Sequence, residues 1–109
     1  MNPQAPPRWH DMRTDESRKV EELLRQRFPN TDAYRYNSAS IRVRVVAPEF
    51  QGKSRDERDA LVESLLDQLP RETQQDIMNL LTLYPGEADD SLRAKLHNLE
   101  FEDPTPSTL

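Results

Sequence analysis

The side chains most able to do chemistry gather in the stretch "EFQGKSRDERDALV", residues 49–62. Lys53, Arg55 and Arg58 lie at the start of a predicted helix, where free backbone amides attract anions. The acids Asp56, Glu57 and Asp59 fill the same turn with negative charge. The stretch therefore has two interpretations, an anion-binding loop or only a well-capped helix start.

The second interpretation explains the same residues by folding alone. Phe50 fills the core, Gly52 allows a tight bend, and Ser54 with Glu57 three residues later forms a capping box. A protein that binds nothing at this loop would need all of these features. We therefore expect Phe50, Gly52, Ser54 and Glu57 to form a structural loop first and a binding loop second.

A second basic set lies on a predicted hairpin. If Ser38 and Ala39 form a two-residue turn, Asn37 faces Ser40 and Arg35 faces Arg42. The residues Tyr34, Tyr36, Ile41, Val43 and Val45 then face the core, and Arg35, Arg42 and Arg44 share the other face. Like charges opposed across strands are destabilising, so this arginine strip needs counter-charges. They come either from the protein's own acids or from an acidic partner or a phosphate backbone.

Catalytic and metal-binding residues are scarce. The 109 residues include no cysteine, and the histidines are His10 and His97, without carboxylates at metal-ligand spacing. No Ser-His-Asp or paired-carboxylate arrangement is recognisable. We expect no enzyme activity, no cofactor and no metal.

Composition further limits the class of protein to which this chain can belong. A chain of this length forms one small domain, and its net charge of −5 argues against a general grip on nucleic acid. No run is long and apolar enough to span a membrane, and the first residues lack the apolar core of a signal peptide. The absence of cysteine suits a reducing compartment, so we expect a cytoplasmic protein.

Hydrophobic periodicity predicts the elements that position these residues. Thr14 caps a first helix that reaches Phe28, and Pro70 ends a second helix that Ser54 begins. A weaker C-terminal helix has Leu92, Leu96 and Leu99 as its apolar stripe. The predicted helices cover residues 14–28, 54–69, 71–77 and 88–98, and the predicted strands 33–37, 40–46 and 79–84. The fold class is α+β: an α-β-β-α-α-β order with a three-stranded sheet packed on helices, plus the C-terminal helix.

The two ends differ from the rest in composition. Residues 1–13 and 100–109 are rich in proline and polar residues, which predicts a flexible arm and a flexible tail around a domain at residues 14–99. Trp9 is an exception within the arm. It either docks on its own domain, hangs in solvent, or belongs to a short partner-binding arm.

The element order, "RQRFPNTDAYRYN" and "VRVVAPEFQGKSRDERDALV" resemble the BolA-like proteins over residues 16–85. The most specific part is Phe50, Gly52 and Ser54, then Arg58 and Val62, at the spacing that the family shows. The resemblance implies a fold similar to type II KH domains.

The chain departs from the family at its histidines. Asp59 and Met78 occupy the positions of two family histidines that are associated with an iron–sulfur cluster shared with a monothiol glutaredoxin. Neither side chain replaces the thiolate or imidazole that such clusters use. The resemblance therefore implies a divergent member that lacks the cluster ligands, and we expect no cluster sharing with a glutaredoxin.

Two functions remain open. The first is a non-catalytic interaction and regulatory module that binds a protein partner. The second is a KH-like nucleic-acid binder that uses the arginine strip and the Gly52–Arg58 loop. A KH loop needs two glycines, and Gly52-Lys53-Ser54-Arg55 offers one.

Overall fold

The structure is a computed structural model that describes residues 7–108. Over these residues the chain forms, in order, η1 (Arg8–Met12), α1 (Asp15–Arg25), β1 (Thr31–Asn37), β2 (Ser40–Val46), η2 (Pro48–Phe50), α2 (Arg55–Leu66), α3 (Arg71–Asp76), β3 (Ile77–Leu83), α4 (Glu87–Asp90) and α5 (Leu92–Glu102), where η marks a 3-10 helix. The predicted α+β class and the α-β-β-α-α-β order followed by a C-terminal helix are confirmed. In this described part of the chain, no helix has the length and apolar character needed to cross a membrane.

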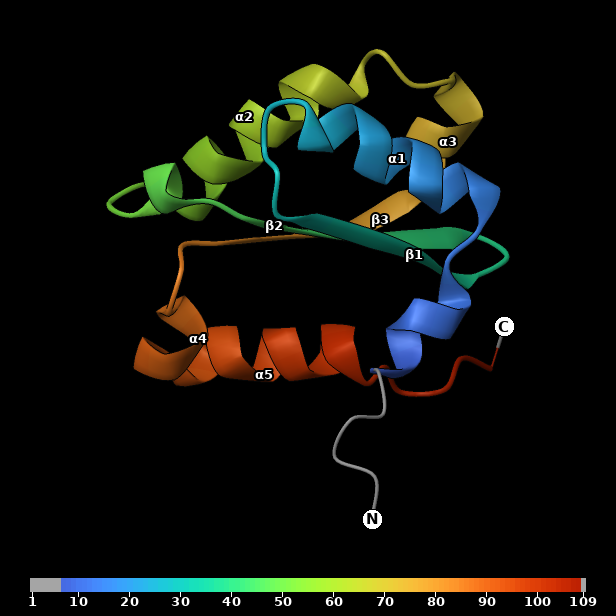
Figure 1. Cartoon of the computed structure of the whole chain (residues 1–109). Coiled ribbons are helices and arrows are strands. Elements are labelled where there is room, and N and C mark those ends of the chain that lie inside the picture. The colour runs from blue at the N-terminus through green and yellow to red at the C-terminus, as the bar shows by residue number, and fades with distance from the viewer. Residues whose placement is uncertain (1–6, 109) are drawn as a thin grey trace.

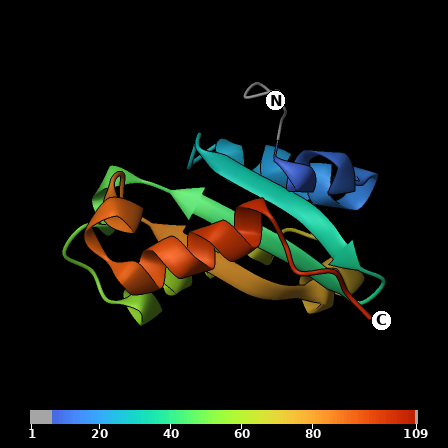
Figure 2. The ribbon, with the colours of Figure 1, turned by 90° about the horizontal axis from the view of Figure 1, so that it is seen from below.

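A mixed sheet lies between two layers of helices. Its strand order is β1-β2-β3, with β1 antiparallel to β2 and β2 parallel to β3. Figure 1 shows α1, α2 and α3 on one face of the sheet and α4 and α5 on the other. Figure 2, seen from the α5 side, shows α5 lying across the strands. Because both faces are covered, the strands carry apolar residues on both sides.

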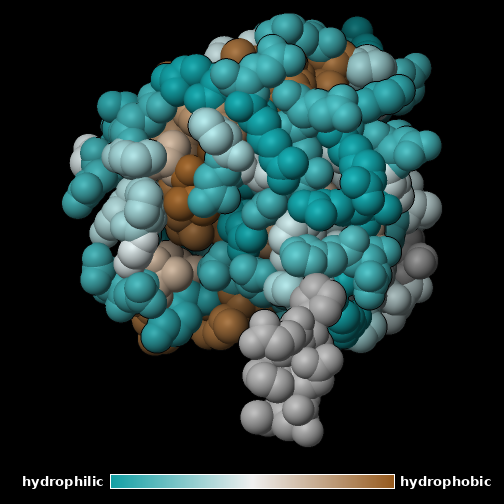
Figure 3. Space-filling view, in the orientation of Figure 1, coloured by the Kyte–Doolittle hydropathy of each residue, from teal (hydrophilic) through white to brown (hydrophobic). Residues whose placement is uncertain are grey.

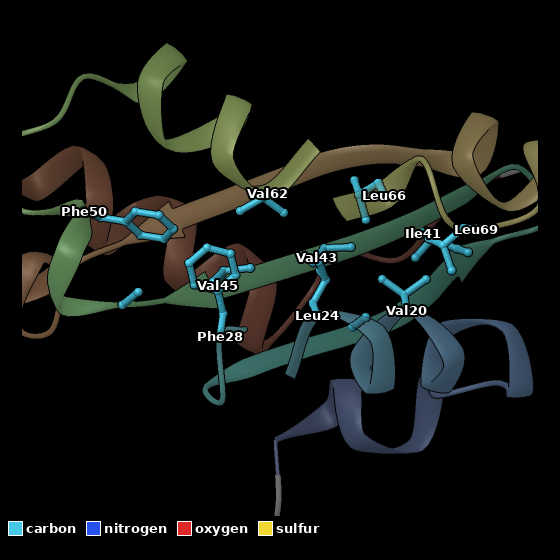
Figure 4. Close-up of a cluster of buried hydrophobic side chains, with 12 residues drawn as sticks. Val20, Leu24, Phe28, Ile41, Val43, Val45, Phe50, Val62, Leu66 and Leu69 are labelled. Atoms are coloured by element: carbon cyan, nitrogen blue, oxygen red, sulfur yellow. The ribbon is translucent and has the colours of Figure 1, made fainter. Parts of the chain in front are cut away.

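The first core fills the space between the sheet and the helices α1 and α2. Thr14 caps α1 through its side chain, and α1 contributes Val20 and Leu24 to the core. The strand β2 contributes Ile41, Val43 and Val45, and Figure 4 shows these side chains pointing toward α1 and α2. The i, i+4 spacing of the helical residues gives each helix one apolar face, which packs against the sheet.

The hairpin register differs from the prediction by one residue. Asn37 does face Ser40, but Arg35 then faces Ile41 instead of Arg42. The register shifts between Arg35 and Asn37, so Tyr36 is the extra residue of a β-bulge. A shift of one residue moves every later side chain of the strand to the opposite face.

The bulge therefore separates the predicted arginine strip. Arg35 points toward α1 and α3, where it pairs with Glu16 and Asp76. Arg42 and Arg44 point to the α5 side of the sheet, where they pair with residues of α5. Tyr34 also faces α5 and not the first core.

A second core lies under α5, and it includes residues of the predicted arm and tail. Trp9, Tyr34 and Phe101 pack together there with ring centroids 4.8–6.1 Å apart. Trp9 is docked, and its Nε1–H donates to Glu102 Oε2 at 2.8 Å. After α5, Pro104 is buried too. These terminal segments pack because they cover an apolar face of the sheet, which their own composition does not reveal. Residues 1–6 and 109 of the predicted arm and tail lie outside the described residues.

The predicted C-terminal helix 88–98 is divided into α4 and α5 in the structure, and α5 ends later, at Glu102, and buries another face. Its buried residues are Ala94 and Phe101, whereas Leu92, Leu96 and Leu99 are 72%, 55% and 55% exposed. The predicted apolar stripe is therefore not the one that packs on the sheet. A helix buries the side that fits its neighbour, and here the ring of Phe101 fits between Tyr34 and Trp9.

Candidate functional site

A groove runs along the C-terminal strand β3 between the start of α2 and α5. It consists of two cavities of about 270 and 240 Å³, which share Arg55, Leu81, Arg93 and His97 in their walls. We call it the basic groove, because its cationic or ionisable basic residues are Arg42, Lys53, Arg55, Arg58, Arg93 and His97. Its basic residues come from segments far apart in sequence: β2, the loop before α2 with the first turns of α2, and α5.

The loop before α2 is held by its own residues. Phe50 is fully buried and its ring lies 5.5 Å from that of Phe28, between centroids. Gly52 has a φ of +83°, which a residue with a side chain adopts only with strain. This loop geometry places Lys53 at the mouth of the groove.

The start of α2 satisfies its own amides. The Glu57 N–H donates to Ser54 Oγ at 3.2 Å, and the Ser54 N–H donates to Glu57 Oε1 at 2.8 Å. The hydrogen bonds from Ser54 lower the pKa of Glu57, so this carboxyl stays charged and remains at the cap. The capping box leaves little room for an anion at these amides. The structural interpretation of the loop accounts for its backbone, and any anion would be bound by side chains instead.

Arg58 connects several elements by hydrogen bonds inside the protein. Its Nη1 donates to Glu87 Oε1 at 2.7 Å and to the Thr82 carbonyl at 3.1 Å, and its Nε donates to the Lys53 carbonyl at 3.0 Å. The residue is buried. It therefore ties α2 to β3 and α4 and has little capacity left for a ligand.

Arg42 likewise forms its ion pair within the protein, with a residue of α5. Its Nη1 donates to Glu100 Oε2 at 2.9 Å and to the Tyr34 hydroxyl at 3.3 Å, and its guanidinium lies 3.6 Å from the centroid of the Tyr36 ring. Burial raises the pKa of the Tyr34 hydroxyl, which donates to the Phe101 carbonyl at 3.0 Å. Arg42 thus holds α5 to the sheet at the edge of the groove.

Glu100 receives hydrogen bonds from two directions. Partial burial would raise its pKa, but hydrogen bonds from Thr105 and Arg42 outweigh burial and lower it. The Glu100 carboxylate is therefore charged and already neutralised by Arg42.

Arg44 and Arg35 lie outside the groove. Arg44 donates to Asp32 and Glu102 at 2.7 Å each and to Asn98 Oδ1 at 2.9 Å, and it is buried. Arg35 donates to Asp76 Oδ2 at 2.9 Å and Glu16 Oε1 at 3.0 Å on the opposite face of the sheet. The counter-charges of the predicted strip are thus the protein's own acids.

Other basic side chains of the groove have no ion pair or only a weak one, and we call their charge uncommitted. Among the described residues, Lys53 and Arg93 form no ion pair, and the sole ion-pair partner of Arg55 is Asp59 at 3.7 Å. His97 lies exposed on α5 beside Arg93. The structure places Arg42, Lys53, Arg55 and Arg58 along one groove, whose walls also include Arg93 and His97.

Sequence reasoning missed Arg93 and His97. Both lie in the predicted C-terminal helix, and their one signal was a local run of basic residues at positions 93, 95 and 97. Their place beside Arg55 depends on α5 folding back across the sheet (Figure 2).

The two positions of the family histidines carry neither imidazole nor thiolate. Asp59 Oδ1 accepts a hydrogen bond from Thr82 Oγ1 at 3.1 Å, and Met78 is 69% exposed on β3. Across residues 7–108, no three side chains of His, Cys, Asp or Glu gather in a way that could hold a metal ion.

No protein-family model matches the sequence, and no curated protein matches it either. Solved structures do match. The BolA domain of SufE1 from Arabidopsis thaliana superposes with a TM-score of 0.52 and 19% identity, covering 68% of this chain and 96% of that domain. BolA1 from Arabidopsis thaliana gives 0.51 and 18% over the same shares. The chain therefore has the fold of BolA domains, and the predicted resemblance is confirmed at the level of the fold.

Proposed function

We propose that this chain is a non-catalytic interaction and regulatory module on the BolA fold, and that its basic groove binds an acidic segment of a partner protein. The observation that carries the proposal is the imbalance of uncommitted charge. Lys53, Arg55 and Arg93 surround the groove without strong counter-ions, while its acids Glu87 and Glu100 already pair with Arg58 and Arg42. A partner that brings carboxylates into the groove would meet Lys53 and Arg93, which form no ion pair among the described residues. It would also meet Arg55, whose ion pair with Asp59 is long and partly exposed.

A protein segment fits this site better than a nucleic acid. The KH-like alternative relied on the arginine strip and the Gly52–Arg58 loop. The three arginines of the strip and Arg58 of the loop are paired inside the protein. Single-stranded nucleic acids also stack their bases on exposed aromatic rings. The aromatic ring that lines the groove is Phe101, which is buried. The net charge of −5 further weakens attraction for a long phosphate backbone.

The proposed function includes neither cluster sharing nor catalysis. The iron–sulfur cluster implied by the family resemblance does not fit this chain, because Asp59 and Met78 offer neither thiolate nor imidazole and the sequence has no cysteine. Catalysis would need convergent titratable groups, and His97 has no carboxylate hydrogen-bonded to it within the described residues.

The test compares two anionic probes on the full chain. A fluorescein-labelled oligoglutamate peptide and a labelled single-stranded RNA of mixed sequence are titrated by fluorescence anisotropy at two salt concentrations. The groove variant is Arg55→Ala with Arg93→Ala. The matched control is Arg18→Ala with Lys19→Ala, which removes the same charge from the exposed side of α1.

The expected effect follows from the energy of exposed ion pairs. Two pairs of about 0.5–1 kcal/mol each correspond to a weakening of about fivefold to thirtyfold. We expect this loss for oligoglutamate in the groove variant and little change in the control. Equal loss in both variants would mean unspecific attraction and would contradict the proposal. Groove-dependent RNA binding that exceeds oligoglutamate binding would favour the KH-like alternative.

A further inference from the structure

The outer face of α5 carries an unusual set of side chains. Leu92, Leu96 and Leu99 are 72%, 55% and 55% exposed, and we call them the leucine ridge. Their spacing of four and three residues places them along one line of the helix, opposite the buried Ala94 and Phe101. Figure 3 shows apolar surface at the lower edge of the molecule, on the side where Figure 1 places α4 and α5.

The leucine ridge is not explained by the packing of α5. The helix can bury one face, and that face is already occupied by Phe101, which contacts Tyr34 and Trp9. Three half-exposed leucines present roughly 300 Å² of apolar surface, a size at which patches on monomers are often functional. A chain with 34% hydrophobic residues leaves three of its leucines in solvent on a single helix.

The unpaired charges on α5 itself have one sign, and the exposed acids near it lie beyond its two ends. Arg93 and Lys95 follow Leu92 on the same helix, and neither forms an ion pair with any described residue. The acids of the same helix, Glu100 and Glu102, already form ion pairs with Arg42 and Arg44. The charge that is left for a partner of α5 is therefore positive, and it matches carboxylates on the partner.

The ridge and the basic groove form one continuous surface. Arg93 and His97 line the groove, and their sequence neighbours Leu92 and Leu96 belong to the ridge. On this basis we propose that the partner's segment is an amphipathic helix. Its apolar stripe packs along the leucine ridge and its acidic flank reaches Arg93 and Arg55 in the groove. This inference rests on the proposed function for the acidic half of the contact.

A helix fits the ridge by length and by shape. Leu92 and Leu99 are seven residues apart, about 10 Å along the axis, which is two turns of a helix laid against them. A ridge of leucines packs into the groove between rows of side chains on a second helix. Such anchors at i, i+3, i+4 and i+7 are the usual way in which an amphipathic helix is recognised.

Two other occupants fit less well. A second copy that docked by the ridge alone would bury roughly 300 Å² on each side, whereas a stable interface needs about 800 Å² on each side. A membrane surface prefers helices whose polar face is rich in Lys and Arg. Here Asp89 and Asp90 of α4 and Asp103 after α5 lie exposed next to the ridge helix and would repel anionic lipids.

The test uses a labelled amphipathic peptide with leucines at i, i+3, i+4 and i+7 and glutamates on one flank, and a scrambled peptide of the same composition. The ridge variant is Leu92→Gln, Leu96→Gln and Leu99→Gln in the full chain. Met78→Gln is the control, because Met78 is equally exposed but lies on β3. Unchanged fluorescence of Trp9 under α5 shows that each variant remains folded.

We expect the wild-type chain to bind the amphipathic peptide at least about tenfold more tightly than the scrambled one, the difference that about 1.4 kcal/mol makes. The ridge variant should bind both peptides equally and still bind oligoglutamate, whereas Met78→Gln should behave as wild type. Equal wild-type affinity for both peptides overturns the helix proposal and leaves the groove proposal intact. Unchanged oligoglutamate binding in Arg55→Ala with Arg93→Ala would overturn the groove proposal and leave the ridge proposal intact.

The same variants decide between the occupants. Sedimentation equilibrium of the chain alone that shows a dimer, abolished by the ridge variant, would assign the ridge to a second copy. Ridge-dependent binding to phosphatidylserine vesicles would assign it to a membrane. Either result overturns the proposal of a partner helix.

Discussion

The attachment of α5 to the sheet should depend on one ring. Phe101 is 4% exposed, its ring centroid lies 4.8 Å from that of Tyr34 and 5.5 Å from that of Trp9, and the Arg44 guanidinium lies 4.5 Å from its centroid. Phe101→Ala removes the ring from all three contacts at once and opens a cavity between α5, η1 and β1.

The expected cost is large for a chain of this size. Replacing a buried phenylalanine by alanine typically costs about 3–5 kcal/mol, because the transfer energy of the ring and the cavity both count. Whole domains are stable by about 5–15 kcal/mol. At about 4–8 °C for each kcal/mol, the midpoint of thermal unfolding should fall by at least about 10 °C.

Trp9 provides a local readout, since it is the single tryptophan of the sequence and packs on Phe101. In Phe101→Ala we expect red-shifted tryptophan emission and easier quenching by acrylamide, together with the lower midpoint. Leu99→Ala is the matched control on the same helix, and it should change stability by under about 0.5 kcal/mol because Leu99 is 55% exposed. A costly Leu99→Ala beside a neutral Phe101→Ala would refute the orientation of α5 and, with it, the leucine ridge.

Three further predictions concern the loop, acid stability and the iron–sulfur cluster. In urea melts, Phe50→Ala should cost about 3–5 kcal/mol, Ser54→Ala about 1 kcal/mol and Lys53→Ala under about 0.5 kcal/mol, and a neutral Phe50→Ala would contradict the structural role of this buried ring. The lowered pKa of Glu100 means that its contribution is complete above its ordinary pKa of 4.5 and is lost as the pH falls through the lower folded value. The stability difference between wild type and Glu100→Gln should therefore shrink in acid, and a difference that grows in acid would contradict this assignment. Co-expression with a monothiol glutaredoxin should give a colourless complex or none, and a brown complex with cluster absorbance would show that the chain does hold a cluster.

Local sequence signals were sufficient for most elements of the fold. The caps at Thr14 and Ser54 and the apolar spacing of α1 and α2 act over a few residues, so they can be recognised without the tertiary structure. The element order followed from them, and the BolA-like fold followed from the order together with the residues around Gly52. The confirmed part of the prediction is the part that short-range physics controls.

The register of the hairpin could be determined only from the tertiary structure. A β-bulge at Tyr36 adds one residue to β1, and the sequence of the hairpin contains no glycine that would announce it. Because side chains alternate along a strand, that single residue moved Arg35 away from Arg42 and Arg44. The arginine strip of the prediction existed only in the unbulged register.

The candidate site also depended on contacts far apart in sequence. By itself, the sequence determined that cations lie near residues 53–58 and 93–97, that no cysteine is present, and that α5 is amphipathic. The tertiary structure decided which of those cations are paired, that α5 buries Phe101 and leaves its leucines in solvent, and that Arg93 lies across a groove from Arg55. The physical reason is that ion pairing and burial depend on which residues lie next to a side chain in the folded protein. For Arg42 and Leu96 these residues come from distant segments of the chain, which no local sequence pattern connects.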